Sequence, residues 1–312
     1  MRILVTGASG FTGSWMLQHL SNLVQTDLEI IALVNSKIPS DTEKNGITYI
    51  KGDLLDFVNL KRHISSLIPD RVIHLAGLNR GTLYELLNTN VVGTKNLLDV
   101  LQSINDKCRV LVISSSSGYG YAGDHPISET SPLMPLSEYG ISKMGQDVLC
   151  EMFYKNKGTH VAIARPFNLV GPGLSSLFVC GGIIRQVIEI EKGKKQFIDL
   201  LEIASCRDFI DVRDAVAAYW SLLSHPEFEH MCIGKAFNVG SGNAHTISSV
   251  IESIEEITGE KYIVHLASKL AYISIPTQRS DNTHIHKTTG WSPKIPLKKS
   301  LRDMLEVARK NS

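Results

Sequence analysis

The sequence has few cysteines, almost no net charge and no long hydrophobic run. Its five cysteines are scattered and include no C-x-x-C pair, which favours reduced thiols over a disulfide framework or a zinc site. The 32 basic and 31 acidic residues leave a net charge of +1, without a basic stripe that would suit nucleic acid. Strand-like sequence begins at Arg2 and no apolar run could span a bilayer, so we expect neither a signal peptide nor a membrane partner. Together these absences predict a cytoplasmic protein without a metal site.

The chain of 312 residues can bury a sizeable core, and it contains no internal repeat and no low-complexity linker. Short apolar, β-branched segments are typical of strands buried on both faces of a parallel sheet. The predicted strands cover residues 2–6, 29–34, 47–50, 72–75, 110–113, 161–165 and 236–239. We expect an α/β fold with a doubly wound parallel Rossmann sheet over residues 1–166. A smaller α+β substrate-binding part should follow over 167–312, with a return to the sheet at about 212–240.

A glycine-rich turn comes directly after the first strand. In G-A-S-G-F-T-G, the residues Gly7, Gly10 and Gly13 permit a tight turn and let backbone N–H groups approach a pyrophosphate at a helix N-terminus. Such triplets also arise only to pack a helix against a strand. Their position after the first strand nevertheless favours dinucleotide binding, with Phe11 and Thr12 of the same turn as further contacts.

The end of the second strand helps to distinguish NAD from NADP. An acidic residue there would bind the ribose hydroxyls of NAD and repel a 2′-phosphate. The chain has none at this place, and Asn35, Ser36 and Lys37 can instead hydrogen-bond and neutralise a phosphate. We expect NADP(H), with NAD still possible, and the alternative for Lys37 is an ordinary loop lysine.

Further cofactor contacts are expected where the next strands end. Asp53 either accepts a hydrogen bond from an adenine amino group or caps a helix. We interpret His74 as a sheet histidine with satisfied hydrogen bonds. Asn90 lies within an apolar helix predicted over 83–101, either as a polar anchor or as part of the site. The predicted cofactor contacts of these later segments are Asp53, Leu54, Leu75, Ala76, Gly77, Asn90 and Arg165.

A run of serines and a Y-x-x-x-K pattern follow the strand over 110–113. Tyr139 and Lys143 are four residues apart, so both lie on one face of a helix that Tyr139 opens. A tyrosine has a pKa of about 10, and a nearby lysine ammonium would favour its phenolate. A serine hydroxyl beside it can hold a substrate carbonyl. Alone, the Y-x-x-x-K pattern is ordinary helix surface. In a chain that also has a glycine turn and a strand followed by serines, it predicts a proton-transfer site.

With these residues assembled, the sequence resembles the extended short-chain dehydrogenase/reductase family over nearly its whole length. Within it, the chain is most similar to reductases of GDP-4-keto-6-deoxy-D-mannose, above all in R-P-F-N-L-V-G-P-G, C-R-D-F-I-D-V-R-D-A-V-A-A-Y-W and T-G-W-S-P-K-I-P-L-K-K-S-L. The resemblance implies that Tyr139 is the acid/base, that Lys143 activates it and contacts the nicotinamide ribose, and that Ser115 faces the substrate. The resemblance implies substrate contacts at Ser115, Asn168 and Arg207, and further substrate contacts are expected at Ser116, Val179, Arg185 and Arg279. For Arg207 the alternative is a structural ion pair with Asp208 or Asp211.

The chain also departs from its relatives. Ser116 and Ser117 stand where sugar 4,6-dehydratases of the family carry acids, and Ser116 stands where fucose-type epimerase-reductases carry a cysteine. We therefore expect neither water elimination nor epimerisation at C3 and C5. Ala271 stands where an arginine is expected, which leaves Lys269 or Arg279 as phosphate partners.

The expected activity is NADPH-dependent reduction of the C4 ketone of a nucleotide-linked 4-keto-6-deoxyhexose, with GDP-4-keto-6-deoxy-D-mannose as the first candidate and GDP-D-rhamnose as product. The alternatives are a nucleotide-sugar 4-epimerase that holds NAD tightly and a non-catalytic NADP-binding regulatory protein. The resemblance also implies a homodimer with a four-helix interface, formed by the helix over 83–101 and the helix of Tyr139. The apolar residues expected to contribute from the second helix are Val148, Leu149, Met152 and Phe153.

Overall fold

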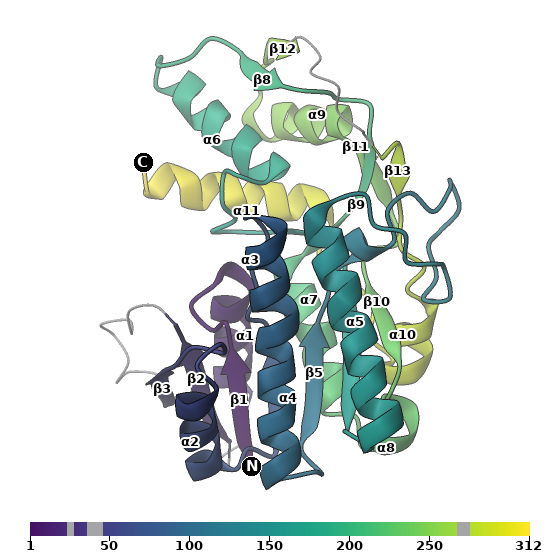
Figure 1. The fold of residues 1–312 in the computed structure, drawn as a ribbon. Coiled ribbons are helices and arrows are strands. Elements are labelled where there is room, and N and C mark those ends of the chain that lie inside the picture. Colours follow the sequence, from purple (N-terminus) through teal and green to yellow (C-terminus); the bar gives the residue numbers. More distant parts are fainter. Residues whose placement is uncertain (24–27, 36–45, 267–274) are drawn as a thin grey trace.

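Seven parallel strands form the central sheet (Figure 1). The computed structural model describes residues 1–23, 28–35, 46–266 and 275–312. The strand order is β10-β6-β5-β4-β1-β2-β3, so it reverses between β1 and β4. The strands are β1 (Arg2–Thr6), β2 (Glu29–Val34), β3 (Ile47–Lys51), β4 (Arg71–His74), β5 (Arg109–Ile113), β6 (Val161–Pro166) and β10 (Ala236–Val239). The predicted doubly wound Rossmann sheet is confirmed, and each predicted strand end lies within about one residue of the observed end.

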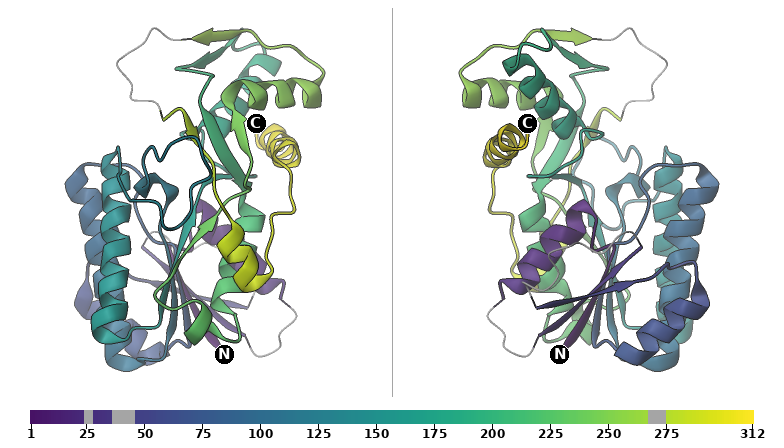
Figure 2. Two further views of the ribbon diagram at one scale, coloured as in Figure 1. Left: turned by 90° about the vertical axis from the view of Figure 1, so that its right-hand side faces the viewer. Right: turned by 90° about the vertical axis from the view of Figure 1, so that its left-hand side faces the viewer.

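Helices cover both faces of the sheet because both faces are apolar (Figure 2). In β1, Ile3 and Val5 point into one layer of the core, and Leu4 points into the other. The helices of the first layer are α1 (Phe11–Ser21), α7 (Val212–Leu223) and α10 (Thr283–Thr289), with the short α8 (Phe228–Met231) nearby. Those of the second layer are α2 (Phe57–Leu67), α3 (Leu83–Leu87), α4 (Gly93–Ile104) and α5 (Glu138–Lys157).

The helix predicted over 83–101 contains a π-helical turn. It runs from α3 through the wider turn at Asn88–Val92 into α4. Such turns accommodate one extra residue and occur often at functional sites. The turn carries Asn90, which is fully buried and bonded to the backbone of Leu78 and to the hydroxyl of Ser142. The structure thus places Asn90 as the polar anchor of the loop that follows β4.

The smaller part of the molecule lies beyond the carboxyl ends of the sheet strands (Figure 1). Its strand β9 (Cys206–Asp211) pairs with β7 (Asn168–Val170), β11 (Ala244–Thr246) and β13 (Thr277–Gln278), while β8 (Ile198–Leu200) pairs with β12 (Val264–Leu266). A third core is formed with α6 (Val179–Glu191), α9 (Ile247–Thr258) and α11 (Leu297–Lys310). In the described part of the chain, none of the helices has the length and apolar character needed to cross a membrane.

Candidate active site

A cleft of about 430 Å³ lies between the carboxyl ends of the sheet strands and the smaller part. Because the strand order reverses between β1 and β4, this edge is where open α/β sheets bind their ligands. The structure brings many of the predicted site residues together here. Those that line the cleft are Gly7, Gly10, Phe11, Thr12, Gly13, Leu75, Gly77, Ser115, Ser116, Tyr139, Lys143, Asn168 and Val179.

The glycine turn has the geometry of an anion site. Gly7 adopts φ +66°, and a Cβ atom there would lie 2.6 Å from the backbone nitrogen of Ala76. A Cβ atom on Gly13 would lie 2.2 Å from the carbonyl oxygen of Gly7. The helix that follows, α1, begins after Gly10 without a capping side chain from the described residues and without an acidic residue in its first turn. Backbone N–H groups at this positive helix end are therefore available to a pyrophosphate, so the turn fits a dinucleotide.

Helix α5 positions the phenol and the ammonium of the site. Its N-cap is Ser137, whose hydroxyl accepts a hydrogen bond from the backbone N–H of Gly140 at 3.0 Å. Tyr139 lies in the first turn, and Lys143 follows one turn later with its Nζ 6.0 Å from the centre of the tyrosine ring. Ser115, two residues after β5, lines the cleft together with Tyr139, and its hydroxyl donates to Oγ of Ser117 at 3.1 Å. The three predicted catalytic side chains therefore converge.

The electrostatics of Tyr139 differ from the prediction. Burial raises the pKa of Tyr139, and the neighbouring hydroxyl of Ser115 offsets only part of that effect. The expected lowering by Lys143 is not seen. The ammonium donates to the carbonyl of Ile113 and to Oε1 of Gln146, each at 2.9 Å, and burial lowers its own pKa to about 8. The phenol therefore stays protonated at neutral pH, which suits a proton donor.

The serines after β5 form a tight turn at the mouth of the cleft. Ser115 accepts a hydrogen bond from the backbone N–H of Ser117 at 3.1 Å and caps the short 3₁₀ turn Ser116–Gly118. The carbonyl of Ser116 accepts from Nε2 of Gln278 at 3.1 Å, and the hydroxyl of Ser116 lies 3.4 Å from Oε1 of Gln278. Gln278 lies on β13, 162 residues further along the chain, so no local pattern signals it. Other lining residues that sequence reasoning missed are Asn79, Ser114, Ser117, Phe178 and Cys180.

Three polar residues lie behind the wall of the cleft. His74 is fully buried and hydrogen-bonded on both ring nitrogens, which confirms its interpretation as a satisfied sheet histidine. The side-chain amide of Asn90 is hydrogen-bonded to the backbone of Leu78 and to Ser142. Arg165 is buried in a network in which its Nε donates to Asp147 at 2.7 Å and its Nη1 to the hydroxyl of Tyr119 at 2.8 Å. The predicted cofactor contacts at Asn90 and Arg165 are therefore not among the residues lining the cleft.

The residues near the ends of β2 and β3 also lie outside the lining of the cleft. The carboxylate of Asp53 accepts from the backbone N–H of Leu55 at 2.9 Å, and the N-cap of α2 is Asp56, so the capping alternative for Asp53 is wrong. Leu54 is buried against Gly93, while Asn35 is exposed where β2 ends. Four residues singled out in the sequence lie outside the described residues: Ser36, Lys37, Lys269 and Ala271.

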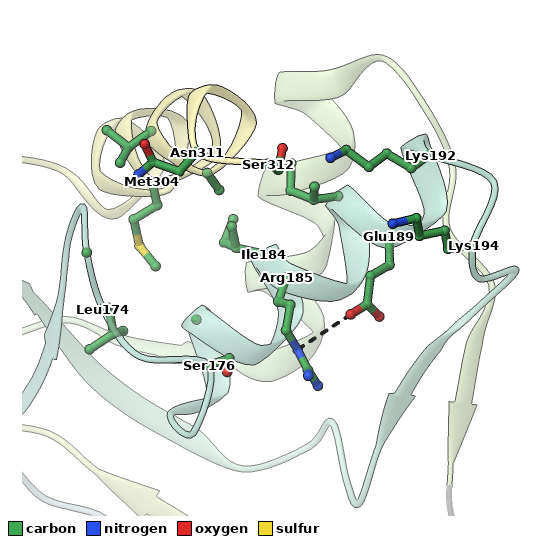
Figure 3. Close-up of a pocket in the computed structure, with 15 residues that line it drawn as sticks. Leu174, Ser176, Ile184, Arg185, Glu189, Lys192, Lys194, Met304, Asn311 and Ser312 are labelled. Carbon is green, nitrogen blue, oxygen red and sulfur yellow. Dashed lines mark ion pairs between the residues drawn. The ribbon is translucent and has the colours of Figure 1, made fainter.

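The three predicted substrate arginines occupy different places. Arg207 on β9 donates from Nη1 to the carbonyl of Ile275 at 2.7 Å and is half-buried. Arg279 follows Gln278 of β13 and is half-buried as well. Arg185 lines a second pocket of about 420 Å³ between α6 and α11, where its Nε lies 3.9 Å from Glu189 (Figure 3). None of the three arginines is therefore among the residues that line the cleft, and Arg185 lies in the other pocket.

The charge that lines the cleft is of one sign, positive. Lys143 is its only charged lining residue in the described part of the chain, and neither aspartate nor glutamate lines it there. A carboxylate acid or base for removing water from a sugar therefore has no candidate among these lining residues, in agreement with the serines at 116 and 117.

Comparison with known proteins gives consistent matches over the whole chain. Residues 4–304 match the family model described as GDP-mannose 4,6 dehydratase. GDP-6-deoxy-D-mannose reductase of Pseudomonas aeruginosa is 32% identical over 97% of this chain and 96% of that protein. A UDP-glucose 4-epimerase of Halalkalibacterium halodurans is 26% identical over 99% of this chain and 94% of its own. The solved structure of RMD from P. aeruginosa complexed with NADPH superposes with a TM-score of 0.84 at 30% identity, covering 100% and 99% of the two chains.

Proposed function

The chain belongs to the GDP-mannose 4,6-dehydratase family of extended short-chain dehydrogenases/reductases, and we propose that it reduces the C4 ketone of a nucleotide-linked 4-keto-6-deoxyhexose with NADPH. The proposed substrate is GDP-4-keto-6-deoxy-D-mannose, and the product is GDP-D-rhamnose. One observation carries the proposal: Ser115, Tyr139 and Lys143 line the same cleft as the glycine turn, while no aspartate or glutamate of the described residues does. Similarity to a reductase over nearly the full length of both chains supports it.

The cofactor supplies the hydride when bound, and the protein supplies orientation and the proton. Ser115 hydrogen-bonds the ketone oxygen and fixes it beside the phenol. Tyr139, kept protonated by its raised pKa, donates its proton to that oxygen as negative charge develops there. Lys143, the charged lining residue of the cleft, would contact the nicotinamide ribose of the bound cofactor.

The glycine turn and the strand ends form the cofactor side of the cleft. Gly7, Gly10 and Gly13 would hold the pyrophosphate, and Leu75 and Gly77 would lie against the dinucleotide. The absence of an acid at Asn35, where β2 ends, supports NADPH. The NADPH in the similar P. aeruginosa structure supports it as well, while NAD is the alternative.

The smaller part, over residues 167–312, would bind the nucleotide sugar. Asn168 and Val179 already line the cleft from β7 and from the start of α6. Arg207 and Arg279, on the neighbouring strand β9 and just after β13, do not line the cleft, and they would supply the positive charge that a diphosphate requires from the strands beside it. Arg185 has no place in this assignment because it lines the other pocket.

A homodimer through α4 and α5 completes the proposal. Val148 on α5 is 57% exposed and Ile141, two turns earlier on the same face, is 37% exposed. Phe153, expected in the interface, is instead fully buried within its own subunit. The apolar surface offered to a partner is therefore smaller than the sequence suggests.

The experiment combines a nucleotide analysis with an assay. The purified protein is examined for bound nucleotide and is then mixed with NADPH and GDP-4-keto-6-deoxy-D-mannose. The proposal predicts exchangeable cofactor, one NADPH oxidised per ketone reduced, and a 6-deoxyhexose product. Tightly retained NAD, with interconversion of UDP-hexoses and no net NADPH oxidation, would establish the epimerase alternative. The similarity to a UDP-glucose 4-epimerase is the reason for testing it.

A further inference from the structure

A chain of buried hydrogen bonds runs from the catalytic lysine across the sheet to β1. Nζ of Lys143 donates to Oε1 of Gln146 at 2.9 Å, and Nε2 of Gln146 donates to Oγ1 of Thr94 at 2.7 Å. Nε2 of His74 lies 2.9 Å from the same Thr94 oxygen, and Nδ1 of His74 lies 2.7 Å from Oγ1 of Thr6. Lys143 is 5% exposed and the other four residues are fully buried.

The direction of each bond follows from the hydroxyl of Thr94. That hydroxyl donates to the carbonyl of Asn90 at 2.6 Å, so its single proton is already used. It therefore accepts from both Gln146 and His74, which places the imidazole proton on Nε2 and leaves Nδ1 to accept from Thr6. Burial keeps His74 neutral, since it lowers the pKa to about 3. Because the Thr94 oxygen accepts from both Gln146 and His74, a proton cannot pass from one to the other through it. The hydrogen-bonded series therefore holds these side chains in place and does not conduct protons.

This series of hydrogen bonds connects the two parts of the proposed site, the catalytic lysine and the glycine turn. At one end it fixes the ammonium of Lys143, which also donates to the carbonyl of Ile113. At the other end Thr6 accepts a hydrogen bond from the backbone N–H of Ala76 at 3.2 Å, directly beneath Gly7 of the cofactor turn. Thr94 lies at the junction, in the first turn of α4 just after the π-helical turn, and does not line the cleft.

We propose that Thr94 is a positioning residue for the reduction, because its hydroxyl holds Lys143 through Gln146 and ties that arrangement to the cofactor turn through His74 and Thr6. This inference rests on the proposed function for the identity of the reaction. A buried polar group with no partner is costly, so the network has one well-defined arrangement. The other groups that face Lys143 are the ring of Tyr139, the carboxylate of Asp147 and the thiol of Cys150.

The test is to replace Thr94 by valine, which keeps the shape and removes the hydroxyl. Both Gln146 and His74 then lose their acceptor, Gln146 no longer holds the ammonium, and Lys143 loses its charge at a lower pH. We expect kcat to fall by roughly tenfold to a hundredfold, and the alkaline limb of the pH profile of kcat/KM to begin at lower pH. Thr94→Ser, which keeps the hydroxyl, should restore both.

Thr159→Val is the matched control. Thr159 is equally buried, at 3% exposed, and its hydroxyl donates to Oε1 of Gln102 at 2.7 Å far from the cleft. We expect it to lower thermal stability while leaving kcat and the pH profile unchanged. Should Thr94→Val fail to fold, Gln146→Met removes the acceptor of Lys143 directly and is expected to shift the profile in the same direction.

A second readout does not require turnover. The pH dependence of NADPH binding, followed by nicotinamide fluorescence, should shift to lower pH in Thr94→Val and not in Thr159→Val. A wild-type protein that binds NADPH without reducing the keto sugar contradicts the proposed function, yet it leaves this comparison in place. Wild-type pH dependence of both binding and turnover in a folded Thr94→Val protein overturns the positioning role.

Discussion

Burial shifts the pKa values of Tyr139 and Lys143 in opposite directions, so that the two values move apart. Burial raises the pKa of Tyr139 and lowers that of Lys143 to about 8, since each charged form loses hydration. At neutral pH both groups carry their protons, which is the state that a reduction needs at its start.

Replacing Tyr139 by phenylalanine should lower kcat by roughly 100-fold or more while leaving the Kd for NADPH nearly unchanged, because only the proton donor is lost. Steady-state kinetics and a fluorescence titration measure the two quantities. Tyr121→Phe is the control, since that hydroxyl donates to Asp124 at 3.0 Å, lies on an exposed residue and should be dispensable. Near-full activity of the Tyr139→Phe protein would remove the tyrosine from the mechanism.

The activity should fall as the pH rises through about 8. Lys143 is charged below its lowered pKa and neutral above it, so kcat/KM is expected to be flat on the acid side of this value and to fall about tenfold per pH unit on the alkaline side. Lys143→Arg keeps its charge throughout, because a guanidinium does not deprotonate. We expect a lower maximal rate in this variant with the limb near 8 absent, and the same limb in both proteins would assign it to another group.

The sequence is informative for site residues that are close together in the chain and poor for those that are not. The glycine turn and the pair Tyr139 and Lys143 each lie within a few residues of one another, so their spacing alone predicts a shared face. Gln278 reaches Ser116 from a distant strand, and only tertiary structure can place it. Arg165 and Arg185 were expected among the site residues, but Arg165 is buried in a network with Asp147 and Arg185 lines the other pocket.

The N-cap of α5 links local helix stability to catalysis. Ser137 satisfies the backbone N–H of Gly140 next to Tyr139, so Ser137→Ala should cost about 1 kcal/mol of folding free energy and should also lower kcat several-fold, because the first turn frays. Chemical denaturation and kinetics measure the two effects. Thr246→Ala removes the equivalent cap of α9, a 3.0 Å bond to Ser249, and should cost similar stability without changing kcat. Equal kcat in both variants would show that the cap has no role in positioning.

The elements themselves were predictable because apolar, β-branched runs and turn residues determine where buried strands begin and end. The π-helical turn at Asn88–Val92 was not. It inserts one residue into a helix whose hydrophobic spacing looks continuous, and its residue Asn90 accepts a hydrogen bond from the backbone N–H of Leu78, a tertiary contact that no local pattern signals. The smaller sheet around β9 was equally hard to predict, since its strands are short and come from four separate segments.

At the scale of the whole molecule, the exposed apolar face of α5 should hold two copies together. Val148→Asp puts a charge into this face and should convert a dimer into a monomer, as measured by light scattering at micromolar concentration. Val58→Asp is the control, because Val58 is 76% exposed but belongs to α2, outside the two proposed interface helices, and should leave the assembly unchanged. A monomeric wild-type protein would show that α4 and α5 are covered sufficiently within one subunit.

The most direct test of the reductase assignment follows the hydride itself. NADPH that carries deuterium at the transferable C4 position is incubated with the protein and GDP-4-keto-6-deoxy-D-mannose, and the sugar product is examined by NMR. The account predicts one deuterium at C4 of the hexose for each cofactor oxidised, because the site delivers hydride to the ketone and then releases the oxidised dinucleotide. A product without deuterium, formed while the added NADPH stays reduced, would contradict it.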